Sequence, residues 1–141
     1  MTTSLVLDSE AVSVLFSTGT DARRKALIAQ IEAARGTRRT RSRPVGRVVV
    51  PTTVRVEAGW GRTAPNTSAL NRLTIADHAL DAGAANVAAT IRRTTEVSPA
   101  DAHVGALIRA LAHDETVVVA TSDEADMHLV AGDRQIKTLK L

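Results

Sequence analysis

The stretch Thr116-Val-Val-Val-Ala-Thr121 decides the fold, because five of its six residues are β-branched and none is charged. A short run of this kind is typical of a strand that helices cover on both faces of a parallel sheet. The segment before it carries apolar side chains at helical spacing, namely Val104, Leu107, Ile108 and Leu111. With Ser98 as N-cap and Pro99 in the first turn, this segment predicts a helix that leads into the strand.

The start of the chain shows the same alternation of strand and helix. Residues 4–8 form an apolar run that ends in an acid and predict a buried strand, and residues 9–16 predict a short helix. Thr20 or Asp21 would cap a second helix. The apolar side chains on one face of that helix are Leu27, Ile28 and Ile31. A strand followed by helices is a common beginning for a parallel-sheet protein.

The middle of the chain predicts a second strand and its helix. Residues 45–50 form a mostly apolar run, and Pro51 ends the strand because proline lacks a backbone donor. Thr52 or Thr53 would then cap a helix that runs to Gly59. This places another helix directly after a strand.

The remaining segments complete an α/β pattern. A short third strand is indicated by Leu73, Ile75 and Ala76. Residues 81–93 predict an Ala-rich helix with Val87 and Ile91 facing inward, and residues 135–141 predict a strand at the edge of the sheet. The order of elements predicts a doubly wound, mostly parallel sheet with helices on both faces. A chain of 141 residues without internal repeats is expected to form a single domain over residues 1–141.

The composition excludes several kinds of site. The chain has no cysteine, which excludes a disulfide framework and a zinc site with thiolate ligands. No apolar run approaches the roughly 18 residues of a membrane span, and no basic region precedes an apolar run at the N-terminus. We therefore expect no membrane insertion and no secretion, and a cytoplasmic location.

The positive charge is concentrated in one segment. The chain has a net charge of +3, and five arginines stand within nine residues: Arg35, Arg38, Arg39, Arg41 and Arg43. Removing these five charges from +3 leaves −2, so the basic character belongs to this segment. Local arginine clusters are typical of phosphate recognition. A solvated loop without a ligand is the alternative interpretation.

Acidic residues follow the predicted strands. Asp8 ends the first strand, and Asp123 and Asp126 follow the strand at residues 116–121. Glu57 lies on the helix after the second strand, and Asp101 stands in the first turn of a helix. Ligands of open parallel sheets bind beyond the carboxyl ends of the strands, so we expect these carboxylates to converge on one cleft. Oxygen ligands without cysteine favour Mg²⁺ or Mn²⁺ over zinc.

Each acid also has a purely structural interpretation. Asp101 at the third position of a helix interacts favourably with the helix dipole whatever the function. Asp123 and Asp126 are compatible with a solvated turn, and Glu57 with an exposed helix position. A carboxylate directly after a strand, such as Asp8, also serves as a helix N-cap.

Four segments carry a family resemblance. LVLDSEA, VPTTVRVEAGWGR, SPADAHVGALI and VVVATSDEADM occur in this order and span nearly the whole chain. They resemble the four acidic motifs of PIN-domain ribonucleases, particularly VapC-like toxins of type II toxin-antitoxin systems. The resemblance implies a PIN-like fold and a Mg²⁺-dependent endoribonuclease, with Mn²⁺ as an alternative metal.

The same resemblance assigns roles to individual residues. The family's metal-binding acids fall on Asp8, Glu57, Asp101 and Asp123, with Asp126 as a fifth member. Asp8, Asp101 and Asp123 would coordinate the cation, and Glu57 would hold the attacking water. Thr121 or Ser122 would place a hydroxyl beside the metal. The expected products carry a 5′-phosphate and a 3′-hydroxyl.

Partners are implied as well. The substrate would be single-stranded or looped RNA, and the candidates for backbone contact are Arg38, Arg39, Arg41 and Arg62. VapC-like relatives form homodimers and are inhibited by a cognate antitoxin whose basic tail occupies the acidic cleft. Two features depart from the family pattern: Met127 stands where an aromatic residue is common, and the arginine-rich insertion is longer.

Other functions fit parts of the same pattern. The chain could be a PIN-like nuclease for RNA maturation or a DNA-directed one, or a catalytically silent module that grips a basic partner. A phosphoryl-acceptor domain would use Asp8 but would leave Glu57 and Asp101 without a role. Surface or packing roles are expected for the four histidines, His78, His103, His113 and His128.

Overall fold

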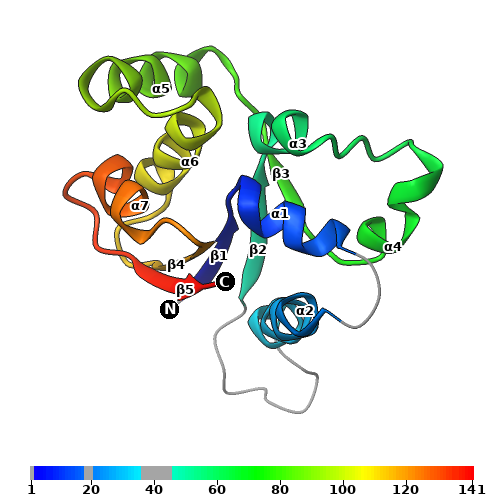
Figure 1. The fold of residues 1–141 in the computed structure, drawn as a ribbon. Coiled ribbons are helices and arrows are strands. Elements are labelled where there is room, and N and C mark those ends of the chain that lie inside the picture. Colours follow the sequence, from blue (N-terminus) through cyan, green and yellow to red (C-terminus); the bar gives the residue numbers. More distant parts are fainter. Residues whose placement is uncertain (1, 18–20, 36–45) are drawn as a thin grey trace.

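A computed structural model describes residues 2–17, 21–35 and 46–141 and shows an α/β fold with a five-stranded parallel sheet. The strands are β1 (Thr3–Leu7), β2 (Arg47–Pro51), β3 (Ala76–His78), β4 (Thr116–Thr121) and β5 (Lys137–Lys140). The helices are α1 (Ser9–Phe16), α2 (Ala22–Arg35), α3 (Thr52–Ala58), α4 (Ser68–Asn71), α5 (Ala82–Thr95), α6 (Pro99–Ala110) and α7 (Glu124–Ala131), with a 3₁₀ turn at Pro65–Thr67. Helices α1 and α2 lie on one side of the sheet and α5, α6 and α7 on the other (Figure 1). The predicted fold class is confirmed.

The strand order is β3-β2-β1-β4-β5. The chain moves outward from β1 to β2 and β3, then crosses back to place β4 on the other side of β1. The order therefore reverses between β1 and β4, and an open α/β sheet has its ligand crevice at the carboxyl ends of such a pair. Leu7 of β1 is paired with Ala120 of β4, so Asp8 and Thr121 follow at that point.

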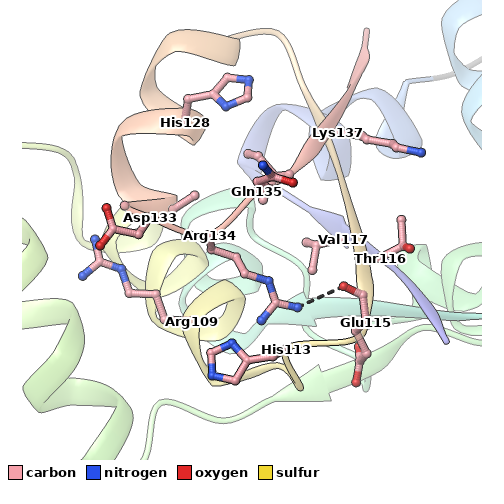
Figure 2. A pocket seen from close by; sticks show the side chains of 13 residues that line it. Arg109, His113, Glu115, Thr116, Val117, His128, Asp133, Arg134, Gln135 and Lys137 are labelled. Carbon is pink, nitrogen blue, oxygen red and sulfur yellow. Dashed lines mark hydrogen bonds between the residues drawn. The ribbon is translucent and has the colours of Figure 1, made fainter. Parts of the chain in front are cut away.

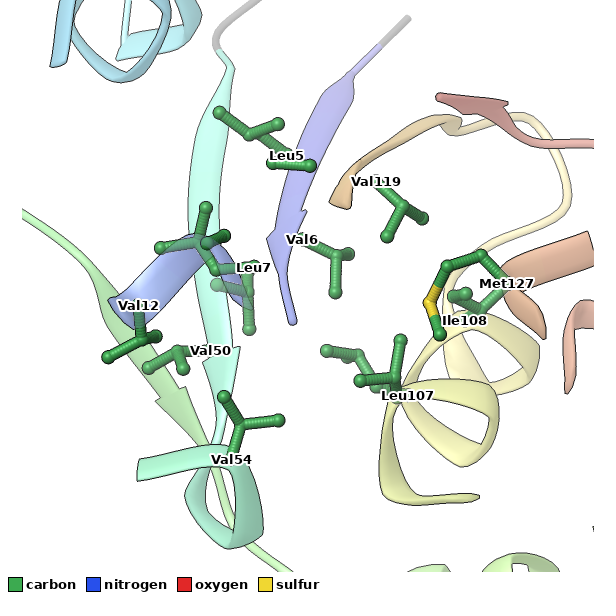
Figure 3. Packing of buried hydrophobic residues seen from close by; sticks show 14 of the residues in the cluster. Leu5, Val6, Leu7, Val12, Val50, Val54, Leu107, Ile108, Val119 and Met127 are labelled. Atoms are coloured by element: carbon green, nitrogen blue, oxygen red, sulfur yellow. The ribbon is translucent and has the colours of Figure 1, made fainter. Parts of the chain in front are cut away.

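The central strands divide the core into two layers. Figure 3 shows Val6 of β1 on the side of Leu107 and Ile108, whereas Leu7 lies on the side of Val12. All five side chains are at most 1% exposed. Successive residues of one strand are thus buried against helices on opposite faces of the sheet, which explains why these strands are continuously apolar.

Helix α6 passes through the middle of one layer. Ser98 caps it, because its hydroxyl accepts from the backbone N–H of Asp101 at 3.1 Å, and Pro99 occupies the first turn, as predicted. The helix approaches its neighbours closely at Gly105. A Cβ built there would lie 2.8 Å from the Cβ of Val130 on α7 and 2.9 Å from Cδ1 of Ile91 on α5.

Several sequence predictions were wrong in detail. Pro51 belongs to β2 and is itself the N-cap of α3, and neither Thr52 nor Thr53 caps that helix, because no side-chain cap hydrogen bond forms. Their hydroxyls make tertiary contacts instead, Thr52 with the N–H of Leu80 and Thr53 with His103. The threonines therefore connect α3 to other elements.

Two other boundaries or faces also differ from the prediction. The third strand starts at Ala76, after Leu73 and Ile75. Val87 on α5 is 39% exposed, so it does not face inward, and the buried positions of that helix are Ala88 and Ile91. Helix α5 packs mainly on α6, and most of its other positions are exposed.

Some predictions fall outside the described residues. These are the capping alternative Thr20, the first strand residue Val45, and the arginines of residues 36–45. Within the described ranges, no helix combines the length and the apolar character that crossing a membrane requires.

Candidate active site

Asp8 stands at the end of β1 and begins α1. Its Oδ1 accepts from the N–H of Ala11 at 2.9 Å, so it caps the helix, and the residue is 5% exposed. Burial raises the pKa of Asp8, while hydrogen bonds from the Thr121 hydroxyl and from Ala11 act in the opposite direction. The N-cap interpretation is confirmed, and it holds the carboxylate at the end of the central strand.

Thr121 links the ends of β1 and β4. Its hydroxyl donates to the Asp8 carboxylate and accepts from the N–H of Asp123 at 2.9 Å. Thr121 is fully buried, whereas the neighbouring Ser122 is exposed. Of the two hydroxyls singled out in the sequence, Thr121 is therefore the one in contact with the predicted acids.

Asp101 shows which acids the fold brings together. Burial raises the pKa of Asp101 to about 6, with further contributions from the negative charges of Asp8, Glu57, Asp126 and Asp123. These four are the other acids predicted from the sequence, and they come from the ends of β1 and β4 and from α3 and α7. All five carboxylates thus lie within electrostatic reach of one point at the carboxyl end of the sheet.

The remaining acids sit at the rim of this cluster. Asp123 caps α7, because its Oδ1 accepts from the N–H of Asp126 at 3.1 Å. Desolvation and the adjacent Asp123 carboxylate raise the pKa of Asp126. Glu57 and Asp123 are exposed. The N-cap role of Asp8 and the position of Asp101 in the first turn of α6 are thus compatible with a shared acidic location. The solvated turn expected at Asp123 and Asp126 was wrong, because Asp123 caps α7 and Asp126 lies in the first turn of that helix.

Two histidines are in contact near the acids: His103 on α6, which also carries Asp101, and His78 at the end of β3. His103 is fully buried, its Nε2 is 3.1 Å from Nδ1 of His78, and its Nδ1 is 2.9 Å from the Thr53 hydroxyl and 3.4 Å from the Thr53 N–H. Because that N–H donates to Nδ1, the proton of a neutral His103 is placed on Nε2, where it donates to His78. Burial, then the neighbouring His78, lowers the pKa of His103 to about 4.

This histidine pair ties together the elements around the acids. It joins α6, which carries Asp101, to the start of α3, which carries Glu57, and to the end of β3. The packing role predicted for His103 is confirmed, and His113 and His128 are exposed. The partners stand 25 and 50 residues apart in the chain, so no local pattern identified the pair.

Arg62 has contacts within the chain. Its guanidinium lies 4.5 Å from the centre of the Trp60 ring, pairs with Asp77 at 2.9 Å, and donates to the carbonyl of Ile75 at 2.7 Å. These contacts give Arg62 a structural role at the edge of the sheet. The other three predicted RNA contacts, Arg38, Arg39 and Arg41, lie outside the described residues.

The donor set has the chemistry of a site for a hard cation. It consists of carboxylate and hydroxyl oxygens, and the Ser9 hydroxyl next to Asp8 is buried without a hydrogen-bond partner among the described residues. No three histidine, aspartate or glutamate side chains in the described ranges stand close enough together to hold a metal ion. The acids thus influence one another electrostatically, but the described side chains are not arranged as the ligands of a bound metal ion.

Comparisons with known proteins give no assignment. No protein-family model matches this chain, and no curated protein does either. The sheet order and flanking helices are consistent with a PIN-like fold. The acids of the other three segments act electrostatically on Asp101, and this effect supports a functional proposal.

Replacing Thr121 with valine is expected to destabilise the protein by about 1–2 kcal/mol, because the Asp8 carboxylate loses a donor and the backbone N–H of Asp123 loses its acceptor. The loss also raises the pKa of Asp8 further. Urea denaturation and NMR titration of the Asp8 carboxyl carbon measure the two effects. Thr121→Ser keeps the hydroxyl and should retain most of the stability and the pKa, so equal values for the valine variant and the wild type would contradict the link.

Proposed function

We propose that this protein is an endoribonuclease that uses Mg²⁺, with Mn²⁺ as a substitute, and that it acts as the toxin of a toxin-antitoxin pair. The observation that supports this most is that four carboxylates act electrostatically on Asp101 at the carboxyl end of the sheet, where the strand order reverses. Crowded like charges are unfavourable alone, and a divalent cation offsets them. The likeness of the four acidic segments to PIN-domain ribonucleases supports the RNA substrate.

The residues divide into those that bind and those that position. Asp8, Asp101, Asp123 and Asp126 would hold the cation, which supplies Lewis acidity and lowers the pKa of a water that attacks the phosphodiester. Glu57, exposed on α3, would orient that water by accepting its hydrogen bond. Thr121 and the N–H of Ala11 keep the Asp8 carboxylate in one orientation.

The histidines are assigned no proton transfer. His103 is buried and its low pKa keeps it neutral at physiological pH, with both ring nitrogens engaged by Thr53 and His78. It would hold α6 against α3 and so maintain the distance between Asp101 and Glu57. In-line attack would leave a 5′-phosphate and a 3′-hydroxyl on the products.

The proposed protein partner is an antitoxin with a basic tail. Lysine and arginine side chains offset the charge of Asp8, Asp101 and their neighbours as a cation would, which explains how a basic segment would compete with the metal. We also propose that the protein forms a homodimer, because the VapC-like toxins that it resembles do so. The arginine-rich segment at residues 35–43 is proposed to contact the RNA backbone, which contributes affinity rather than sequence choice.

The decisive experiment is cleavage of a mixed RNA pool by the purified protein with Mg²⁺, with Mn²⁺ and with EDTA. Asp8→Asn is expected to lose cleavage while keeping the α1 cap, because asparagine also caps helices. Asp81→Asn is the matched control, since Asp81 caps α5 through the same type of bond, 2.8 Å to the N–H of Ala84, outside the acidic cluster. Cleavage that survives Asp8→Asn, or that is lost equally in Asp81→Asn, would contradict the assignment.

A second candidate is a silent or RNA-maturation module that uses the acidic cluster to bind a basic partner. The neighbouring negative charges that help to raise the pKa of Asp101 also favour a positive charge at this position, whether a metal ion or an arginine. Binding of an arginine-rich peptide that weakens in Asp8→Asn, together with no cleavage under any metal condition, would favour the silent module. Cleavage confined to one structured RNA precursor would favour maturation.

A further inference from the structure

A second candidate site lies at the end of the sheet opposite to the acids. It is a pocket of about 960 Å³ beside the starts of β4 and β5 and the ends of α6 and α7 (Figure 2). The basic residues that line it are Arg109, His113, His128, Arg134 and Lys137. Strand β4 spans six residues, or about 20 Å, between this pocket and the acidic cluster. The two sites share no residue.

Arg109 is held in place before any ligand binds. Its Nε donates to the carbonyl of Val130 at 3.1 Å. Its guanidinium lies against Gly132, where a Cβ would be 3.0 Å from Nη2 and 3.2 Å from Cζ. Gly132 has φ +63, a conformation that glycine adopts readily. The terminal nitrogens of Arg109 make no hydrogen bond with the described residues, so their N–H groups are available to a ligand at the pocket.

Arg134 and Lys137 have different functions at this pocket. The terminal nitrogens of Arg134 donate to the carbonyls of Leu111, Ala112 and Glu115, which satisfies the carbonyls that follow α6. The Lys137 side chain is exposed at the start of β5 and makes no hydrogen bond or ion pair with the described residues. Figure 2 shows Lys137 and Arg109 on opposite sides of the pocket.

The acids near the pocket leave it positive. Glu115 pairs with Arg47 at 3.0 Å and accepts from the Ser4 hydroxyl at 2.6 Å, so its charge is compensated. Asp133 is exposed and is the other acid of the lining. The charges of Arg109, Arg134 and Lys137 exceed that of Asp133, which favours an anionic ligand.

We propose that this pocket binds the phosphate groups of a nucleotide or of an RNA strand, with Arg109 and Lys137 as the principal contacts. The fixed guanidinium supplies paired donors, which suit phosphate oxygens, and Lys137 supplies a second positive charge. The volume exceeds that of a single phosphate and lies in the range of sites for small organic ligands. This binding does not depend on the proposed cleavage at the acidic cluster.

The test measures binding of inorganic phosphate, adenosine 5′-monophosphate and a nine-nucleotide oligouridylate to the full chain in EDTA, which prevents metal-dependent cleavage. Lys137→Gln is the main variant, because the Lys137 side chain makes no hydrogen bond or ion pair with the described residues. Arg109→Gln is the second, with its fold checked by circular dichroism. Lys140→Gln is the matched control, since Lys140 is exposed on the same strand, at its other end.

Lys137→Gln and Arg109→Gln are each expected to weaken nucleotide or oligonucleotide binding by about 3- to 10-fold, and Asp133→Asn to strengthen it. For the oligonucleotide, the slope of log affinity against log salt should fall by about 0.7 in Lys137→Gln. An effect on the oligonucleotide alone identifies an RNA backbone, and an effect on the mononucleotide identifies a free nucleotide. No binding of any probe, or equal weakening by Lys140→Gln, would overturn the proposal.

Discussion

Asp101→Asn is expected to reduce metal-dependent RNA cleavage by at least about 100-fold, while the metal-free protein stays as stable as the wild type or becomes more stable. Asparagine preserves the shape of the side chain and the backbone bond to Ser98. It removes the charge on which the carboxylates of Asp8, Glu57, Asp123 and Asp126 act. Loss of activity without loss of stability separates a binding role from a structural one.

Two opposing effects set the stability of this variant. The negative charge of Asp101 in the first turn of α6 interacts favourably with the helix dipole, by about 0.3–1 kcal/mol. Its burial among like charges costs about 1–2 kcal/mol at pH 7 after allowance for solvent screening. The second effect is larger, so a net gain of up to about 1 kcal/mol is expected.

The pH dependence follows from the same shift. Folding raises the pKa of Asp101 from 3.8 to about 6, so the folded protein holds the extra proton between these values and the wild type loses stability as pH rises through them. The lowered pKa of His103, from 6.5 to about 4, makes stability rise over much the same range. The two residues therefore offset each other in the wild type, and Asp101→Asn leaves the rising contribution of His103.

Urea denaturation in EDTA between pH 4 and pH 7.5 measures this difference. The advantage of Asp101→Asn over the wild type should grow from pH 4 to pH 6 and then level off. Parallel curves would show that neither burial nor the neighbouring acids raise the pKa of Asp101. A variant that is less stable at every pH would show that the helix dipole dominates, and the acids would then be separate helix caps.

Gly105→Ala is expected to destabilise the protein by about 2–3 kcal/mol, although alanine is the better helix former. The new methyl group would lie 2.8 Å from the Cβ and the carbonyl oxygen of Val130 and 2.9 Å from Ile91, which forces α6 away from α7 and α5. The gain of about 1 kcal/mol in helix propensity is smaller than the cost of overpacking.

Gly83→Ala is the matched control for this substitution. Gly83 is in the first turn of α5, and a Cβ there would meet only Oδ1 of Asp81, at an ordinary 3.6 Å. This variant is expected to be unchanged or up to about 1 kcal/mol more stable. Thermal and urea unfolding compare the two, and a gain in Gly105→Ala equal to that in Gly83→Ala would contradict the close packing of α6.

Local features of the chain were sufficient to predict most of the elements. The strand at residues 116–121 and the helix that Ser98 caps were predicted correctly, because β-branched runs and N-caps depend on residues within a few positions. The exposure of Val87 was not predictable, since it depends on which positions of α5 pack on α6. Thr52 and Thr53 were misassigned as caps because tertiary partners compete for their hydroxyls.

The sequence by itself determined a parallel α/β fold with an acid at the end of each of two central strands, since hydrophobic runs and the residues that follow them are local properties. Only the tertiary structure decided which acids share one electrostatic site, that Thr121 rather than Ser122 contacts Asp8, and that a pocket with a preorganised Arg109 lies at the other end. The physical reason is that these features depend on distances between segments far apart in the chain. Strand order and helix packing set those distances, which cannot be inferred from residues that are neighbours in the sequence.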